Sequence, residues 1–113
     1  MSSSKKYRIE LSDKFQRQAK KLLKKFPSLK EELVELRNSL AQNPIQGVHM
    51  GWDCYKIRIA IASKGKGKSG GARVITHVYI TGKTVYLLAI FDKSEQETLS
   101  KQELKELLKE IKD

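Results

Sequence analysis

Two stretches near the middle of the chain alternate apolar and polar residues with the period of two that is typical of β-strands. In the first stretch, one face holds Tyr55, Ile57, Ile59 and Ile61, and the other holds Lys56, Arg58, Ala60 and Ala62. In the second stretch, one face holds Val74, Thr76, Val78 and Ile80, and the other holds Arg73, Ile75, His77 and Tyr79. The intervening residues 63–71 contain three lysines, four glycines and no apolar residue. The pattern predicts a β-hairpin that buries one apolar face and carries Lys56, Arg58 and Arg73 on the opposite face.

Helical periodicity flanks this hairpin on both sides. Before it, two amphipathic helices are separated by Pro27, which ends the first because proline cannot continue a helix. Their inward-facing positions are Phe15, Ala19, Leu22, Leu23 and Phe26 in the first helix, and Leu29, Leu33, Leu36 and Leu40 in the second. The last helix is expected to bury Leu104, Leu107, Leu108 and Ile111. The predicted N-caps of the three helices are Ser12, Ser28 and Ser100.

Two further strands complete the predicted order of elements. Residues 7–11 alternate like a short strand, residues 44–54 read as a loop, and residues 84–91 form an apolar strand. The order is β-α-α-β-β-β-α, which indicates an α+β fold with a mostly antiparallel four-stranded sheet. The helical hairpin is expected to cover the isoleucine face and to leave the cationic face at least partly open. We expect a single domain over residues 1–113, with residues 1–6 disordered.

The charge of the chain is large and unevenly distributed. Lys and Arg outnumber Asp and Glu by 23 to 13 over 113 residues, which gives a net charge of +10 and a pI near 9.8. Residues 1–26 carry nine cations against two acids, and residues 44–93 carry eight against two. This segregation favours an anionic partner such as nucleic acid over a role in solubility alone. Lys64, Lys66 and Lys68 of the glycine-rich loop would contact a phosphate backbone as point charges.

Other functional classes lack the residues that they need. No run of about 18 apolar residues is present, so neither a membrane span nor a membrane partner is predicted, and the N-terminus lacks the apolar region of a secretory signal. The single cysteine, Cys54, excludes a disulfide framework and fits a reducing, cytoplasmic setting. His49, Cys54 and His77 lack the spacing of metal ligands, so no metal and no other cofactor is predicted.

Several of these residues together resemble the RelE/ParE superfamily of bacterial toxins, and in particular its RelE/HigB-type branch. The matching runs are Asp53-Cys-Tyr-Lys56-Ile-Arg58-Ile, Lys-Gly-Lys-Gly-Lys-Ser-Gly-Gly-Ala-Arg73-Val-Ile and Phe-Asp-Lys93-Ser-Glu. The resemblance covers nearly the whole chain, including the predicted order of elements. It implies the toxin component of a type II toxin–antitoxin system, which enters the ribosomal A site and cleaves mRNA there. It also implies a cognate antitoxin protein that inhibits the toxin.

The resemblance further implies which residues act. The two cations of the first central strand carry over to Lys56 and Arg58, and the arginine that begins the next strand carries over to Arg73. The basic residue at the end of the last strand carries over to Lys93. The family pattern then has an arginine just after that lysine and a tyrosine near the C-terminal helix. This chain has Ser94 and, approximately, Ser100 at those places.

Cleavage of RNA by its own 2′-OH needs a base, stabilisation of charge on the phosphorane and a proton for the leaving oxygen, none of which requires a metal. Arg58 and Arg73 suit charge stabilisation, because a guanidinium is always charged and forks onto phosphate oxygens. Lys56 would serve as the base if the neighbouring arginines favour its neutral form. His77 is an alternative acid or base, or an RNA contact, although strand rise places it about 13 Å from Arg73.

Two other functions are compatible with the same residues. A ParE-like toxin would use the cations to bind a protein target such as DNA gyrase, and mRNA would stay intact. A non-catalytic nucleic-acid-binding module, or an inactivated toxin, would bind RNA or DNA in a salt-dependent manner and produce no new ends.

Overall fold

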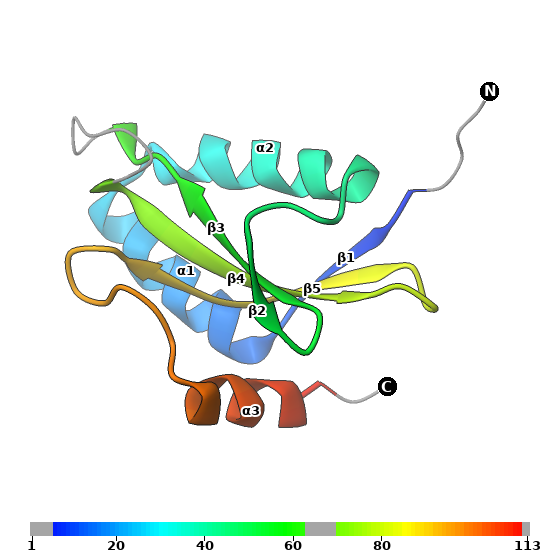
Figure 1. The fold of residues 1–113 in the computed structure, drawn as a ribbon. Helices are drawn as coiled ribbons and strands as arrows, with labels where there is room; N and C mark the ends of the chain where they lie inside the picture. The colour runs from blue at the N-terminus through cyan, green and yellow to red at the C-terminus, as the bar shows by residue number, and fades with distance from the viewer. Residues whose placement is uncertain (1–5, 63–69, 112–113) are drawn as a thin grey trace.

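The computed structural model describes residues 6–62 and 70–111 of the chain. It contains a five-stranded sheet with helices on both faces (Figure 1). The elements in chain order are β1 (Arg8–Leu11), α1 (Asp13–Lys25), α2 (Leu29–Gln42), β2 (Val48–Gly51), β3 (Cys54–Ile59), β4 (Ala72–Tyr79), β5 (Thr84–Asp92) and α3 (Lys101–Lys109). The predicted α+β class and the predicted succession of helices and strands are confirmed, with β2 as an addition. Of the segment predicted to be disordered, residues 1–6, only Lys6 belongs to the described part.

The strands lie in the order β1-β5-β4-β3-β2, so the prediction of four strands was one too few. β1 pairs with β5 in parallel, and every other neighbouring pair is antiparallel. The additional strand, β2, lies in the segment predicted to be a loop, and its Val48 and His49 pair with Lys56 and Tyr55 of β3. A strand of four residues at the sheet edge has too short a pattern to be recognised in sequence, because its formation depends on pairing with β3.

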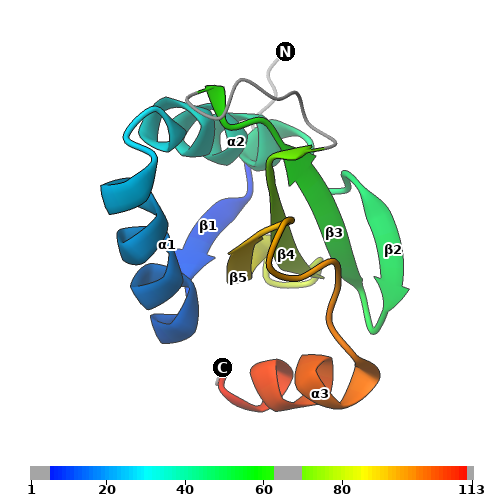
Figure 2. The ribbon, with the colours of Figure 1, turned by 90° about the vertical axis from the view of Figure 1, so that its left-hand side faces the viewer.

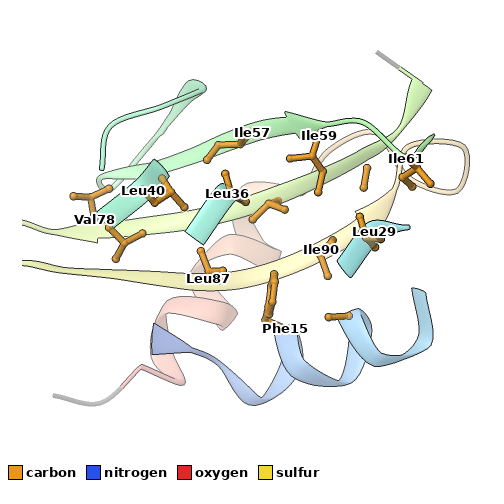
Figure 3. Close-up of a cluster of buried hydrophobic side chains, with 14 residues drawn as sticks. Phe15, Leu29, Leu36, Leu40, Ile57, Ile59, Ile61, Val78, Leu87 and Ile90 are labelled. Carbon is orange, nitrogen blue, oxygen red and sulfur yellow. The ribbon is translucent and has the colours of Figure 1, made fainter. Parts of the chain in front are cut away.

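One face of the sheet packs against α1 and α2 and forms the larger hydrophobic core, which Figure 3 shows in close-up. Ile57 and Ile59 of β3 lie in this core with Phe15 of α1 and with Leu36 and Leu40 of α2. The helical hairpin therefore covers the predicted face. Because side chains alternate along a strand, Lys56 and Arg58 are directed to the opposite face.

The opposite face is partly covered by α3, which lies across the sheet from α2 in Figure 2. Leu104 and Leu107 of α3 pack there in a second, smaller core with Cys54, Ile75, Leu88, Ala89 and Phe91. The β4–β5 register shifts between Ile75 and Thr76, and this bulge lets the consecutive residues Leu88 and Ala89 both contribute to the smaller core. α3 therefore covers part of the face that carries the cations and leaves the rest of that face open.

Two of the three predicted N-caps are present. The Ser12 side chain accepts a hydrogen bond from the Phe15 backbone N–H at 3.0 Å. At the start of α3, the Ser100 side chain accepts from the Glu103 N–H at 3.1 Å, and the Glu103 carboxylate accepts from the Ser100 N–H at 2.9 Å. This reciprocal capping box fixes the position at which the chain turns into α3.

The predicted cap at Ser28 is wrong. Its backbone is already helical (φ −65°, ψ −16°), and its side chain makes no capping hydrogen bond to α2. The N–H groups of Leu29 and Lys30 donate instead to the carbonyl groups of Phe26 and Pro27, at 3.0 and 3.2 Å. The tight turn between α1 and α2 thus satisfies backbone donors that a side-chain cap would otherwise serve.

Candidate functional site

Arg58 and Arg73 stand directly opposite each other on β3 and β4. Both belong to the face that α3 partly covers, because their neighbours Ile57 and Val74 point into the α1–α2 core. Like charges placed opposite each other on adjacent strands repel and destabilise a sheet. The pair therefore concentrates positive charge at one point of the sheet at a cost in stability.

The two arginines differ in burial, although the sequence pattern predicts that both lie on a partly open face. Arg58 is exposed, whereas only 3% of Arg73 is accessible to solvent. The period-two pattern assigns a face to a residue, but it does not report how deeply neighbouring segments cover that residue. Arg73 Nη1 donates to the carbonyl oxygen of Ala72 at 3.1 Å. Burial and the charge of Arg58 lower the pKa of Arg73, with a smaller opposing effect from Glu97, yet a guanidinium stays protonated at neutral pH.

Lys56 and Lys93 extend the same face on either side of this pair. Lys56 is half-buried and lies two residues before Arg58, on the same side of β3. Lys93 follows β5 directly, and its backbone N–H donates to the carbonyl of Gly71, the residue before β4, at 3.0 Å. The structure thus brings the four predicted catalytic cations to one region of the sheet. We call Lys56, Arg58, Arg73 and Lys93 the cationic end.

An acid that sequence reasoning missed approaches the cationic end. Glu97 Oε2 lies 4.0 Å from Lys93 Nζ, and the same carboxylate raises the pKa of Arg73 against the stronger effects that lower it. Glu97 comes from the segment between β5 and α3, and its helix-like spacing of four residues from Lys93 was the available signal. Because Glu97 is exposed, water and salt screen this ion pair, and Lys93 keeps its charge available to a ligand.

His77 lies on the same face but away from the cationic end. It pairs with Cys54 across β3 and β4, four residues along β4 from Arg73. Its Nδ1 is 3.0 Å from the carbonyl oxygen of Trp52, and because a carbonyl only accepts, Nδ1 carries the proton and donates. The Nε2 atom of the neutral ring is then a hydrogen-bond acceptor. The structure therefore does not bring His77 together with the four predicted catalytic residues.

The thiol of Cys54 is close to this histidine but is not a nucleophile at neutral pH. Its Sγ lies 3.6 Å from His77 Nδ1 and 3.5 Å from the Trp52 carbonyl oxygen. Burial, and to a smaller extent the charge of Asp53, raise the pKa of Cys54 to about 12. The residue consequently remains a protonated thiol that packs in the smaller core.

Three predicted RNA contacts, Lys64, Lys66 and Lys68, lie outside the described residues. Within the described ranges, no group of three or more His, Cys, Asp or Glu side chains is arranged to hold a metal ion. Among the helices of residues 6–62 and 70–111, none is long and apolar enough to cross a membrane.

Solved structures that match this chain over most of its length share its small α+β fold. A double arginine-to-alanine variant of the E. coli toxin RelE in the free state matches with a TM-score of 0.58 and 19% sequence identity, over 93% of each chain. The isolated E. coli RelE toxin in a crystal matches with a TM-score of 0.53 and 19% identity, over 93% of this chain and 99% of that one.

The family of this protein follows from its sequence match. The family model described as “RelE toxin of RelE / RelB toxin-antitoxin system” matches residues 7–113. The chain therefore belongs to the RelE toxin family, and the predicted resemblance is confirmed. The resemblance puts an arginine of the family pattern at Ser94 and a tyrosine at approximately Ser100, and both serines of this chain take part in local structure. Ser94 donates through its backbone N–H and its hydroxyl to Asp92 Oδ1, both at 2.9 Å, and Ser100 caps α3.

Proposed function

We propose that this RelE-family toxin is a ribosome-dependent endoribonuclease that cleaves mRNA in the ribosomal A site. A cognate antitoxin would act as its inhibitor in a type II pair, and the protein would act in the cytoplasm. Family membership supports the toxin role and the antitoxin partner. The observation that carries the enzymatic part is the cross-strand pair of Arg58 and Arg73, with Lys56 on the same face of β3. Lys93 lies close by, because its ion-pair partner Glu97 also acts on Arg73.

The proposed reaction is an attack by the ribose 2′-oxygen on the adjacent phosphorus. The new 2′-O–P bond forms as the bond from phosphorus to the 5′-oxygen breaks, which yields a 2′,3′-cyclic phosphate and a free 5′-hydroxyl. Extra negative charge gathers on the non-bridging oxygens during this step. Arg58 is exposed and would fork onto these oxygens, while the buried Arg73 behind it would add positive potential in a less polar environment.

Two protons must also move, one from the 2′-hydroxyl and one to the 5′-oxygen. We assign the first transfer to Lys56, because it is half-buried and shares the strand face of Arg58 two residues away. Lys93, on the far side of the arginine pair, is the corresponding candidate for the second transfer. The loop lysines Lys64, Lys66 and Lys68 remain the predicted contacts to the RNA backbone.

The test uses Arg58→Gln, because Arg58 is exposed and its replacement does not open a buried site. Replacing Arg73 would combine a loss of charge with a loss of packing. We expect Arg58→Gln to lower the rate of mRNA cleavage on purified ribosomes by about a hundredfold or more, since one charge-stabilising donor is worth that much. The matched control is Lys20→Gln, which removes one exposed cation from α1 on the other face of the sheet. Cleavage by the control should be unchanged.

Primer extension on mRNA after induction separates this proposal from its two rivals. The nuclease leaves cuts in phase with codons, and Arg58→Gln removes them. Growth arrest with intact mRNA would point to a ParE-like protein target such as DNA gyrase. Salt-dependent RNA or DNA binding with no new ends would point to a non-catalytic module or an inactivated toxin. Full cleavage by Arg58→Gln would contradict the assigned role of the arginine pair.

A further inference from the structure

A hollow lies on the same face of the sheet as the cationic end, at the opposite end of β4. It encloses about 610 Å³, which is within the range of small-molecule sites. His77, Tyr79 and Tyr86 line it from the sheet, Trp52 from the tip of the β2–β3 hairpin, and Lys105, Leu108, Lys109 and Ile111 from α3 and its end. We call these side chains the aromatic end. Both ribbon views show the hairpin tip reaching toward the side on which α3 lies (Figures 1 and 2).

The aromatic rings of this hollow are held in place and open to solvent. Trp52 and Tyr79 are 46% and 41% exposed, which is high for large apolar side chains. The Tyr79 ring packs onto Gly82 in the next turn, where a Cβ would come within 2.5 Å of it. The ring of Tyr86 stacks on His77 with centroids 6.2 Å apart. The hollow therefore presents preorganised π-faces rather than a collapsed apolar patch.

The turn that carries Trp52 is conformationally unfavourable for its residues. Trp52 and Asp53 both have positive φ, 53° and 58°, in a two-residue hairpin turn where Asn-Gly would be the favoured pair. Hydrogen bonds hold the turn, because His77 Nδ1 donates to the Trp52 carbonyl and the Val78 N–H donates to the Asp53 carbonyl at 2.9 Å. A bulky indole does not stabilise a turn of this conformation. We therefore expect the Trp52 ring to have a role outside the turn.

The charged side chains of α3 are segregated by sign, and its lysines lie on the edge nearest this hollow. The helix carries lysines at four-residue spacing along one edge, at Lys101, Lys105 and Lys109. Its glutamates lie on the other side of the apolar stripe, at Glu103, Glu106 and Glu110. Lys105 and Lys109 line the aromatic hollow, whereas Glu110 lines a separate small hollow with Glu10 and Asp13. Lys101 Nζ lies 5.5 Å from the centroid of the Trp52 ring.

We propose that the aromatic end binds an unstacked base of single-stranded RNA, with the adjacent phosphate held by Lys105 and Lys109. This inference rests on the proposed function in one respect, namely that the substrate is RNA. The rings supply stacking surfaces that accept any base, and the lysines supply the cations for its backbone. His77, four residues along β4 from Arg73, places the bound base at a nucleotide close to the scissile phosphate but not at it.

The composition of the hollow favours RNA over a protein segment. No acid lines it among the described residues, and its polar side chains are lysines, histidine and tyrosine hydroxyls. A peptide would need both aromatic and acidic groups to match this surface, whereas every nucleotide combines a flat π-system with an anion. An acidic peptide is therefore the rival occupant that the experiment must exclude.

The experiment uses the full chain and the intrinsic fluorescence of Trp52, which is the single tryptophan. Adenosine monophosphate and a short oligoadenylate are titrated in as the two ligands, and a base stacked on the indole should quench its emission. An acidic peptide is titrated in separately as the rival occupant. We expect Tyr79→Ala to weaken oligoadenylate binding by about tenfold through the lost stacking contact. Lys105→Glu should weaken it further and lower the salt dependence by about one phosphate contact.

One control and one further variant keep the result interpretable. Lys20→Glu makes the same charge change on α1, and binding should stay within about twofold of the natural protein if the pocket, rather than net charge, carries the affinity. Trp52→Gly relieves a positive φ, so its melting temperature should not fall, while anisotropy of a labelled oligoadenylate should report weaker binding.

The inference is overturned by any of three outcomes. These are no quenching by either ligand, equal weakening by Lys20→Glu and Lys105→Glu, or quenching by an acidic peptide but not by oligoadenylate. Failure of the nuclease proposal is distinguishable from these outcomes. Arg58→Gln tests cleavage and leaves the aromatic end unaltered, so quenching by oligoadenylate would persist even if no cleavage were ever detected.

Discussion

The cationic end and the aromatic end lie on one face of one sheet, yet each departs from local structural preference in a different way. At the cationic end, Arg58 and Arg73 face each other across two strands, where a neutral pair would be more stable. At the aromatic end, Trp52 occupies a left-handed backbone conformation that glycine or asparagine would adopt more easily. Both departures run against general rules for stable local structure, and such positions are typical of functional sites.

The two ends also hold their charge differently. Arg73 is buried and its guanidinium is fixed by the Ala72 carbonyl, whereas Lys105 and Lys109 are exposed along α3. Salt screens exposed lysines strongly and a buried guanidinium weakly. A preorganised field therefore suits the reacting phosphate, whereas exposed and easily screened cations suit an RNA backbone that must bind and then leave.

The largest expected effect comes from Leu104→Ala, which weakens the packing of α3 against the sheet and so tests whether the aromatic end depends on α3. Leu104 is 1% exposed and joins α3 to the smaller core, so we expect a loss of about 3 kcal/mol in the free energy of unfolding. Denaturant unfolding measures this loss, and Trp52 fluorescence should show that oligoadenylate binding falls as well. The matched control is Leu36→Ala in the larger core, which should destabilise comparably but leave binding intact. Equal binding by both variants would show that the aromatic end does not depend on α3.

A smaller effect is expected from removing the cap of α3. Ser100→Ala deletes the hydrogen bond from the Glu103 N–H and should cost about 1 kcal/mol of stability in thermal or denaturant unfolding. Ser100→Asp keeps an acceptor at the same position and should behave like the natural protein. Because the cap sets where α3 begins, Ser100→Ala should also weaken oligoadenylate binding slightly without changing cleavage. A change in cleavage alone would mean that Ser100 acts at the cationic end.

Much of this architecture follows from the sequence. Alternation in two stretches assigns Ile57 and Ile59 to one face and Lys56 and Arg58 to the other, because the side-chain period of a strand leaves no third choice. The register that sets Arg58 opposite Arg73 is not contained in that alternation. It is set by the antiparallel pairing of β3 with β4.

Other features depend on contacts between distant segments, which local patterns do not report. β2 forms by pairing with the edge of β3, and the bulge in β5 places both Leu88 and Ala89 in the smaller core with α3. The burial of Arg73 and the approach of Glu97 likewise arise where separate segments meet. Trp52 is the single tryptophan of the sequence, but no local pattern reports its positive φ or its exposure.

The smallest predicted effect tests the cost of the cationic end directly. Arg58→Gln removes the repulsion between the two guanidinium groups and keeps a side chain of similar length on β3. We expect it to raise the free energy of unfolding by a few tenths of a kcal/mol, within the range of about 0.2–1 kcal/mol for cross-strand pairs. Denaturant unfolding at low and high salt measures the gain, which should shrink at high salt because Arg58 is exposed. The same variant is expected to lose cleavage, so a more stable and inactive protein would show that stability is sacrificed for function here. A loss of stability instead would mean that Arg58 contributes to packing, and the contrast between the two ends would then rest on the strained turn of Trp52 alone.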